Sequence, residues 1–153
     1  MTRIVASTTV LLLVSSVAAA GSTALRVTVR ELLAHPTKFV GKQVDVTGYY
    51  HTSNEESSLF ASERASNQSR GCEDSVWLEP DIWDPRYYPQ RPQKVAKSED
   101  VERRIVRVIG TFHYQPRPIL DKSVPYERRF RGFGSYKMWA RAIMDITYFQ
   151  PVR

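Results

Sequence analysis

Two long segments of this chain alternate apolar and polar residues with a period of two, and each carries a glycine near its centre. The first segment, residues 43–50, has on one face Val44, Val46, Gly48 and Tyr50. The second segment, residues 101–114, has on one face Val106, Val108, Gly110, Phe112 and Tyr114. A period of two indicates a strand with one buried face, and a glycine inside such a strand is typical of a sharply coiled sheet. The two segments therefore predict a small closed β-barrel.

Three further strands are predicted at residues 58–61, 75–79 and 136–147. In the last strand the alternation predicts an inward face made of Met138, Ala140, Ala142, Met144 and Ile146, and an outward face made of Lys137, Trp139, Arg141, Ile143 and Asp145. The complete set is therefore a mainly β fold of five strands.

A short helix is expected before the first strand, over residues 29–35. Thr28 and Glu31 have the spacing of a capping box, in which each side chain binds a backbone amide near the other. Pro36 ends the helix, because the residue before a proline resists helical geometry.

The first twenty residues have the pattern of a removable export signal. Arg3 makes the start positive, residues 4–17 are mainly apolar, and three alanines follow. Hydroxyl residues interrupt the apolar stretch, which is also short for a bilayer span, so that a cleaved leader is favoured over an uncleaved anchor. The sequence thus predicts a signal peptide over residues 1–20 with cleavage near Ala20. A single secreted or periplasmic domain, without a transmembrane anchor, then covers residues 21–153.

Residues 80–97 are predicted to form an extended surface loop inserted in the domain. Its prolines exclude a regular helix or a central strand, and they are Pro80, Pro85, Pro89 and Pro92. Three aromatic side chains of this loop, Trp83, Tyr87 and Tyr88, either pin it to the barrel or face a partner, and pinning is the favoured interpretation.

The order of these segments resembles that of small exported bacterial proteins with an OB-fold-like β-barrel. The likeness covers most of residues 28–149, and the stretches that carry it are 28–33, 41–49, 58–60, 76–78, 106–112 and 132–136. The resemblance implies an OB-fold-like five-stranded barrel and is silent about activity. The chain departs from the common pattern between the third and fourth strands, where the proline-rich loop stands in place of a helix.

The residues that usually perform catalysis or hold metals do not form a known motif. His35, His51 and His113 have none of the spacings of a zinc site. Cys72 is the only cysteine, so no disulfide can form within the chain, and its two acidic neighbours disfavour a reactive thiolate. No nucleophile elbow or phosphate-binding glycine loop occurs. We therefore expect no metal, no cofactor and no enzymatic activity.

Positive charge concentrates between residues 115 and 137, where basic and aromatic side chains are interleaved. The whole chain has 22 Lys and Arg against 16 Asp and Glu. In an OB-fold this segment joins the fourth and fifth strands beside the usual ligand face. Arginine forks suit phosphates and carboxylates, while aromatic rings stack on bases or sugars. With the nearby strand residues, the candidate ligand-binding residues are Arg107, Arg117, Arg128, Arg129, Phe130, Arg131, Tyr136, Trp139 and Arg141.

Structural and functional interpretations of this segment both stay open. In the structural one, Phe130, Phe133 and Tyr136 pack the loop onto the barrel and the arginines keep it soluble. In the functional one, the protein is a binding module whose partner is an anionic polymer or an acidic protein surface. Nucleic acid is less expected, because export makes it less available. The alternatives are a cell-envelope interaction or assembly subunit acting through the aromatic residues of the proline-rich loop, and a small hydrolase with an unrecognised site.

Overall fold

The computed structural model describes residues 23–53, 56–69, 71–79, 94–116, 132–134 and 139–153. The predicted signal peptide and most of the proline-rich loop lie outside these residues. Within the described part of the chain, no helix is both long enough and apolar enough to span a membrane.

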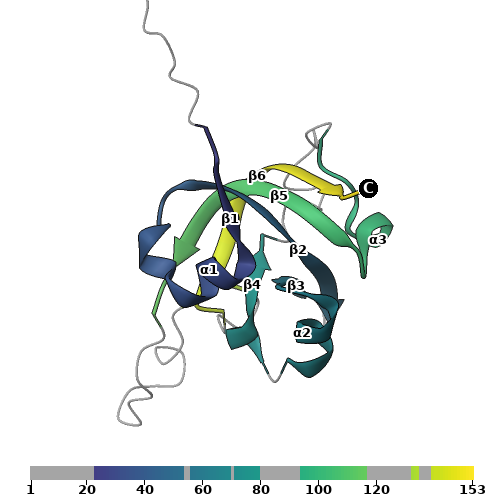
Figure 1. Cartoon of the computed structure of the whole chain (residues 1–153), viewed down its shortest axis with the longest axis horizontal. Coiled ribbons are helices and arrows are strands. Elements are labelled where there is room, and N and C mark those ends of the chain that lie inside the picture. The colour runs from purple at the N-terminus through teal and green to yellow at the C-terminus, as the bar shows by residue number, and fades with distance from the viewer. Residues whose placement is uncertain (1–22, 54–55, 70, 80–93, 117–131, 135–138) are drawn as a thin grey trace, which may run out of the picture.

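The described residues form a strand-rich domain with short helices (Figure 1). The strands are β1 (Leu25–Thr28), β2 (Gln43–Ser53), β3 (Glu56–Phe60), β4 (Ser75–Leu78), β5 (Ile105–Tyr114) and β6 (Arg141–Pro151). The α-helices are α1 (Val29–Ala34), α2 (Glu63–Gln68) and α3 (Ser98–Val101), and the 3₁₀ helices are η1 (Pro36–Lys38) and η2 (Cys72–Asp74). The fold is therefore mainly β, as the sequence predicts.

Five of the strands close into a barrel. The pairs β2–β3, β3–β4, β5–β6 and β2–β5 are antiparallel, and β4–β6 is parallel, so that the hydrogen-bonded ring returns to β2. The predicted closed barrel of five strands is thus confirmed. The sequence did not predict β1, which pairs in parallel with residues 44–47 of β2, while β3 pairs with residues 49–53 further along the same strand.

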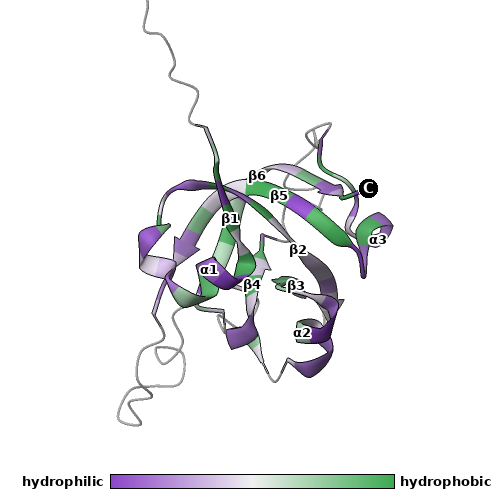
Figure 2. Ribbon diagram, viewed as in Figure 1, coloured by the Kyte–Doolittle hydropathy of each residue, from purple (hydrophilic) through white to green (hydrophobic). Residues whose placement is uncertain are grey.

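The barrel interior is filled by the apolar faces of the alternating strands. Buried and more exposed residues alternate along β5, and Figure 2 shows a hydrophilic band on this strand between two apolar stretches. The largest side chains with almost no exposure are Tyr50, Phe112, Phe149, Leu59, Leu78 and Ile143 on the strands, and Leu32 on α1. The rings of Tyr50 and Phe149 meet edge to face at 5.1 Å between centroids, an arrangement that aromatic pairs prefer.

The central glycines of β2 and β5 are required by close packing. A Cβ atom on Gly48 would lie 2.8 Å from atoms of Leu59, Phe60 and Val29. A Cβ atom on Gly110 would lie 2.6 Å from Ile143 Cγ2 and 2.7 Å from the Met144 carbonyl oxygen. No side chain fits at such distances, so these positions accept only glycine without a shift of their neighbours.

The helix α1 begins with the predicted capping box and packs onto the barrel core. The Thr28 hydroxyl accepts a hydrogen bond from the Glu31 amide, and the Glu31 carboxylate accepts one from the Thr28 amide at 2.7 Å. Val29 and Leu32 are buried in the main core cluster, whereas Pro36 begins η1. The short helix therefore covers core residues beside β4 and β2.

Two predicted strands have boundaries that are wrong by four residues or more. The strand expected from residue 101 begins at Ile105, because residues 98–101 form α3 and Arg103 has a left-handed φ of 58°. The strand expected over residues 136–147 is β6, at residues 141–151. An irregularity opposite Gly110 breaks its alternation: Asp145 has a φ of 50°, and Ile143, expected to face outward, is fully buried.

Candidate functional site

The barrel has two outer faces that differ in what lies over them. On the first, which we call the covered face, one row crosses four strands and consists of Ser58, Trp77, Ala142 and His113. The exposed fractions of Ser58, Trp77 and Ala142 are 4%, 7% and 0%, although their side chains point away from the interior. This row is therefore packed beneath other parts of the chain.

Phe133 and Trp139 form part of that cover. Phe133 stacks on Trp77 with 6.4 Å between ring centroids and meets the His113 ring edge to face at 6.1 Å. The backbones of Phe133 and Trp139 exchange two hydrogen bonds, of 2.8 and 3.2 Å. The Trp139 indole also donates to Ser75 Oγ at 3.0 Å. The aromatic residues on either side of residues 135–138 thus pack onto the barrel.

Arg141, another candidate ligand-binding residue, is the first residue of β6 and pairs with Tyr114, the last residue of β5. Its guanidinium donates to the carbonyl oxygens of Leu33 and Glu73, at 3.1 and 3.3 Å, and lies 6.0 Å from the Tyr114 ring centroid. These contacts join β6 to the end of α1 and to η2. Among the described residues, Arg141 Nε and His113 Nε2 are buried without a hydrogen-bond partner.

Most of the other candidates belong to parts of the chain outside the described residues. Those outside the described residues are Arg117, Arg128, Arg129, Phe130, Arg131 and Tyr136, together with Trp83, Tyr87 and Tyr88 of the proline-rich loop. The remaining candidate, Arg107, lies on β5, seven residues before Tyr114, the partner of Arg141. At about 3.3 Å per residue this separates Arg107 from Arg141 by roughly 20 Å. The structure therefore does not bring Arg107 together with Trp139 and Arg141.

Arg107 belongs to the second outer face, which we call the open face. It consists of two rows across β1, β2, β5 and β6: Thr28, Thr47, Arg107 and Gln150 in one, and Arg26, Asp45, Ile109 and Tyr148 in the other. Arg26, Thr28 and Thr47 are exposed, and only Asp45 is buried. Polar side chains dominate these rows, in contrast to the covered face.

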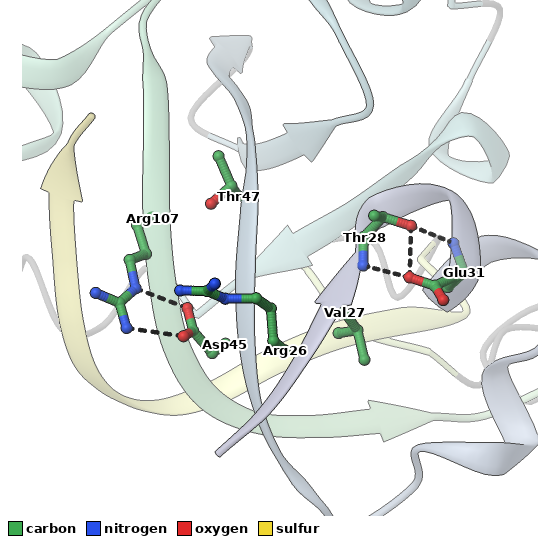
Figure 3. A pocket seen from close by; sticks show the side chains of 7 residues that line it. All are labelled: Arg26, Val27, Thr28, Glu31, Asp45, Thr47 and Arg107. Carbon is green, nitrogen blue, oxygen red and sulfur yellow. Dashed lines mark hydrogen bonds and ion pairs between the residues drawn. The ribbon is translucent and has the colours of Figure 1, made fainter. Parts of the chain in front are cut away.

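Asp45 holds Arg107 in a two-pronged ion pair, shown in Figure 3. Arg107 Nε donates to Asp45 Oδ1 and Arg107 Nη2 donates to Oδ2, both at 2.7 Å. This hydrogen bonding lowers the pKa of Asp45 below its usual 3.8, with the charges of Arg107 and Arg26 acting in the same direction. The guanidinium also lies 5.2 Å from the Tyr148 ring centroid. Arg107 is therefore fixed between a carboxylate and an aromatic ring.

Two hollows meet at Arg107. The first, of about 250 Å³, is lined by Arg26, Val27, Thr28, Glu31, Asp45, Thr47 and Arg107 (Figure 3). The second, of about 510 Å³, is lined by Arg107, Tyr148, Gln150, Pro151, Val152 and Arg153. Arg107 is the residue that the two hollows share, and its side chain is 40% exposed.

A separate polar pair joins the end of β2 to the segment after α3. His51 Nδ1 lies 2.7 Å from Glu102 Oε1, and the Thr52 amide and hydroxyl both donate to the Glu102 carboxylate. Among the described residues, no three His, Cys, Asp or Glu side chains come close enough together to hold a metal ion. These hydrogen bonds therefore attach the segment after α3 to the end of β2.

Sequence reasoning singled out Arg107 on the open face but missed its neighbours. Arg26 was not placed because β1 is too short to be recognised from periodicity, although Leu25 and Val27 flank it in alternation. Tyr148 and Gln150 were missed because the last strand was expected to end at residue 147. The ion pair itself depends on which strands lie side by side, and no local signal reveals that.

Comparison with known proteins leaves the chain without an assigned family. No family model and no curated protein matches it. Among solved structures, one similar chain is a protein from Leishmania major Friedlin assigned as an aspartyl-tRNA synthetase, with a TM-score of 0.36 and 16% sequence identity. The match covers 93% of this chain but only 23% of that one. At this TM-score the likeness carries no argument about fold or activity.

Proposed function

We propose that this protein is an exported, non-enzymatic binding module in which an OB-fold-like barrel engages an anionic partner through the open face. The ring order supports the OB-fold assignment, since its first three strands form a meander and its third strand is parallel to its fifth. Export is proposed from the leader-like pattern of residues 1–20 alone.

The observation that carries the proposal is the fixed guanidinium of Arg107 at the junction of two hollows. A side chain already held by Asp45 and Tyr148 loses little conformational entropy when it binds a ligand. Arg26 lines the first hollow and Arg153 the second, so a further cation lies on each side of Arg107. An ordered arginine flanked by cations suits an acidic ligand.

An anionic polymer is the partner that this arrangement favours. Three described cations, Arg26, Arg107 and Arg153, line the two adjoining hollows of the open face. A polymer with repeated anionic groups can contact all three. The acidic surface of another protein is the second possibility, and nucleic acid is less favoured because of the proposed export.

Retention on heparin as a function of salt tests the proposal. Arg107→Met removes the guanidinium but keeps an unbranched side chain, and we expect it to elute at lower salt than the unmodified chain, because one anion contact is lost. Arg64→Met is the matched control, since Arg64 is exposed on α2, away from the open face. Equal elution of the two variants rejects the open face as the contact surface. Retention that does not weaken as salt rises favours an apolar assembly interface instead.

A further inference from the structure

We propose that the hollow between Arg26 and Arg107 is a subsite for one tetrahedral oxyanion, the phosphate or sulfate group of a larger anionic ligand. This inference rests on the proposed function, because it names the chemical group that the open face recognises.

The strand register brings the two arginines to one place. Arg26 pairs with Asp45 across β1 and β2, and Thr47 pairs with Arg107 across β2 and β5. Arg26 and Arg107 thus lie on the two strands that flank β2, in neighbouring rows. Their Cβ atoms are further apart than the roughly 5 Å of directly opposed residues, and their long side chains bridge this separation. In Figure 3 the Arg107 guanidinium faces the Asp45 carboxylate, and the Arg26 guanidinium overlaps this carboxylate in the view. Besides the hydrogen bonds from Arg107, the positive charge of Arg26 helps to lower the pKa of Asp45, so this guanidinium also lies near the carboxylate.

The Asp45 carboxylate positions Arg107 without using all of its donors. The ion pair takes one N–H of Nε and one of Nη2, and a guanidinium has five N–H donors, so about three remain. The Asp45 side chain is 11% exposed and that of Arg107 is 40% exposed. An approaching ligand therefore meets the guanidinium before the carboxylate. Arg26, Arg107 and Asp45 together keep one positive charge, and Glu31, which also lines the hollow, brings the sum of the four charges to zero.

The second carboxylate of the hollow, that of Glu31, is turned toward its own helix. Glu31 Oε2 accepts hydrogen bonds from the Thr28 amide at 2.7 Å and from the Thr28 hydroxyl at 2.8 Å. The exposed hydroxyl of Thr47 lines the same hollow and is available as a neutral donor. The donors left for a ligand are thus those of two arginines and one threonine.

The hollow has room for a tetrahedral group. Its volume of about 250 Å³ accommodates a phosphate or sulfate. The arginines approach from different strands, and a group with three or four oxygens can meet both. A planar carboxylate ligand would need the two-pronged position on Arg107, which Asp45 already occupies. The second hollow, beyond Arg107, then receives the adjoining part of the ligand.

The test is a titration of the full chain with inorganic phosphate, sulfate and acetate at low ionic strength, followed by the arginine Nε signals in NMR spectra. We expect phosphate and sulfate to shift the signals of Arg26 and Arg107, with acetate binding more weakly. Arg26→Met should weaken phosphate binding about tenfold or more, because a charged hydrogen bond is lost. Arg64→Met should leave it unchanged.

Asp45→Asn is the complementary variant. Asparagine keeps one acceptor oxygen for Arg107, so that Arg107 stays held while the negative charge beside both arginines is removed. Phosphate binding should then strengthen about fivefold, as expected for one charge at about 4 Å in water. If this variant does not fold, Arg26→Met still tests the subsite, because Arg26 is exposed and its replacement should not disturb the fold.

The outcomes separate the subsite from the proposed function. If heparin retention depends on Arg107 but phosphate binds equally to the unmodified chain and to Arg26→Met, the subsite is wrong and the proposed function stands. Acetate binding as tight as that of phosphate also overturns the tetrahedral subsite. If neither heparin retention nor phosphate binding depends on Arg107, both proposals are wrong.

Discussion

The covered and open faces belong to the same barrel and are built from the same alternation of side chains, yet they have opposite characters. On the covered face Trp77 points outward and is 7% exposed, because Phe133 stacks on it. On the open face Arg107 also points outward, and its side chain is 40% exposed although it forms an ion pair with Asp45. Outward orientation in a barrel strand thus does not make a residue available to a partner. What packs over the strand decides that.

The two faces are also stabilised by different interactions. The covered face loses apolar surface from water, and this effect is large for aromatic rings. The open face is held by a partly exposed ion pair, which contributes little to stability because water screens it. Substitutions on the covered face should therefore change stability, and those on the open face should change binding.

The largest effect is expected for Trp77→Ala. Truncation of a buried tryptophan leaves a cavity and should lower the free energy of unfolding by about 3 to 5 kcal/mol. Arg26→Ala, on the open face, should stay within about 0.5 kcal/mol of the unmodified protein. Chemical denaturation of both variants measures the difference. Equal losses of stability would remove the distinction between the faces.

Phe133→Ala tests the cover itself. Loss of the stack on Trp77 should cost about 1 to 2 kcal/mol of unfolding free energy and should expose the Trp77 indole to water. Denaturation measures the first effect, and a red shift of the tryptophan emission reports the second. Because Trp83 and Trp139 also emit, the spectrum is compared with that of Phe133→Ala combined with Trp77→Phe. A red shift that persists without Trp77 would show that Phe133 does not shield Trp77.

A smaller effect, and one that depends on pH, is expected from Asp45. Its pKa in the folded protein lies below the usual 3.8, so the ionised form stabilises the fold above about pH 4, and this contribution disappears as the pH falls through the lowered pKa. The unmodified protein should exceed Asp45→Asn in stability by about 1 kcal/mol at neutral pH, and by less at pH 2 to 3. Denaturation of both at several pH values measures this. A difference that grows on acidification contradicts the ion pair.

The smallest effect is expected for Thr47→Val. Thr47 is exposed and valine suits a strand, so the free energy of unfolding should change by less than about 0.5 kcal/mol. Phosphate affinity should fall about threefold, because one neutral hydrogen bond is lost. A calorimetric titration of this variant against the unmodified chain shows whether the hydroxyl participates.

Much of the fold could be predicted from local patterns. The alternation in β2 and β5, the central glycines and the capping box of Thr28 and Glu31 each depend on residues that are close in sequence. The prediction was wrong where distant packing overrides the pattern. Gly110 lets β6 approach so closely that its alternation breaks at Asp145, and Ile143 turns into the core.

The candidate site was less predictable than the fold. Charge and alternation were enough to select Arg107 as an outward-facing arginine. Its ion partner lies 62 positions earlier in the sequence, and Arg26 reaches the same hollow only because β1 adds to the edge of β2. Trp139 and Arg141 were selected by the same reasoning, and in the structure their donors bind Ser75, Leu33 and Glu73.

The sequence by itself determined that most strands of this chain have one apolar and one polar face, because side-chain alternation is a property of each strand alone. It also determined where the barrel must coil tightly, since only glycine permits the close approach at positions 48 and 110. Only the tertiary structure decided which outward face is covered and which is open. That choice depends on contacts between segments far apart in the chain, and no local pattern encodes them.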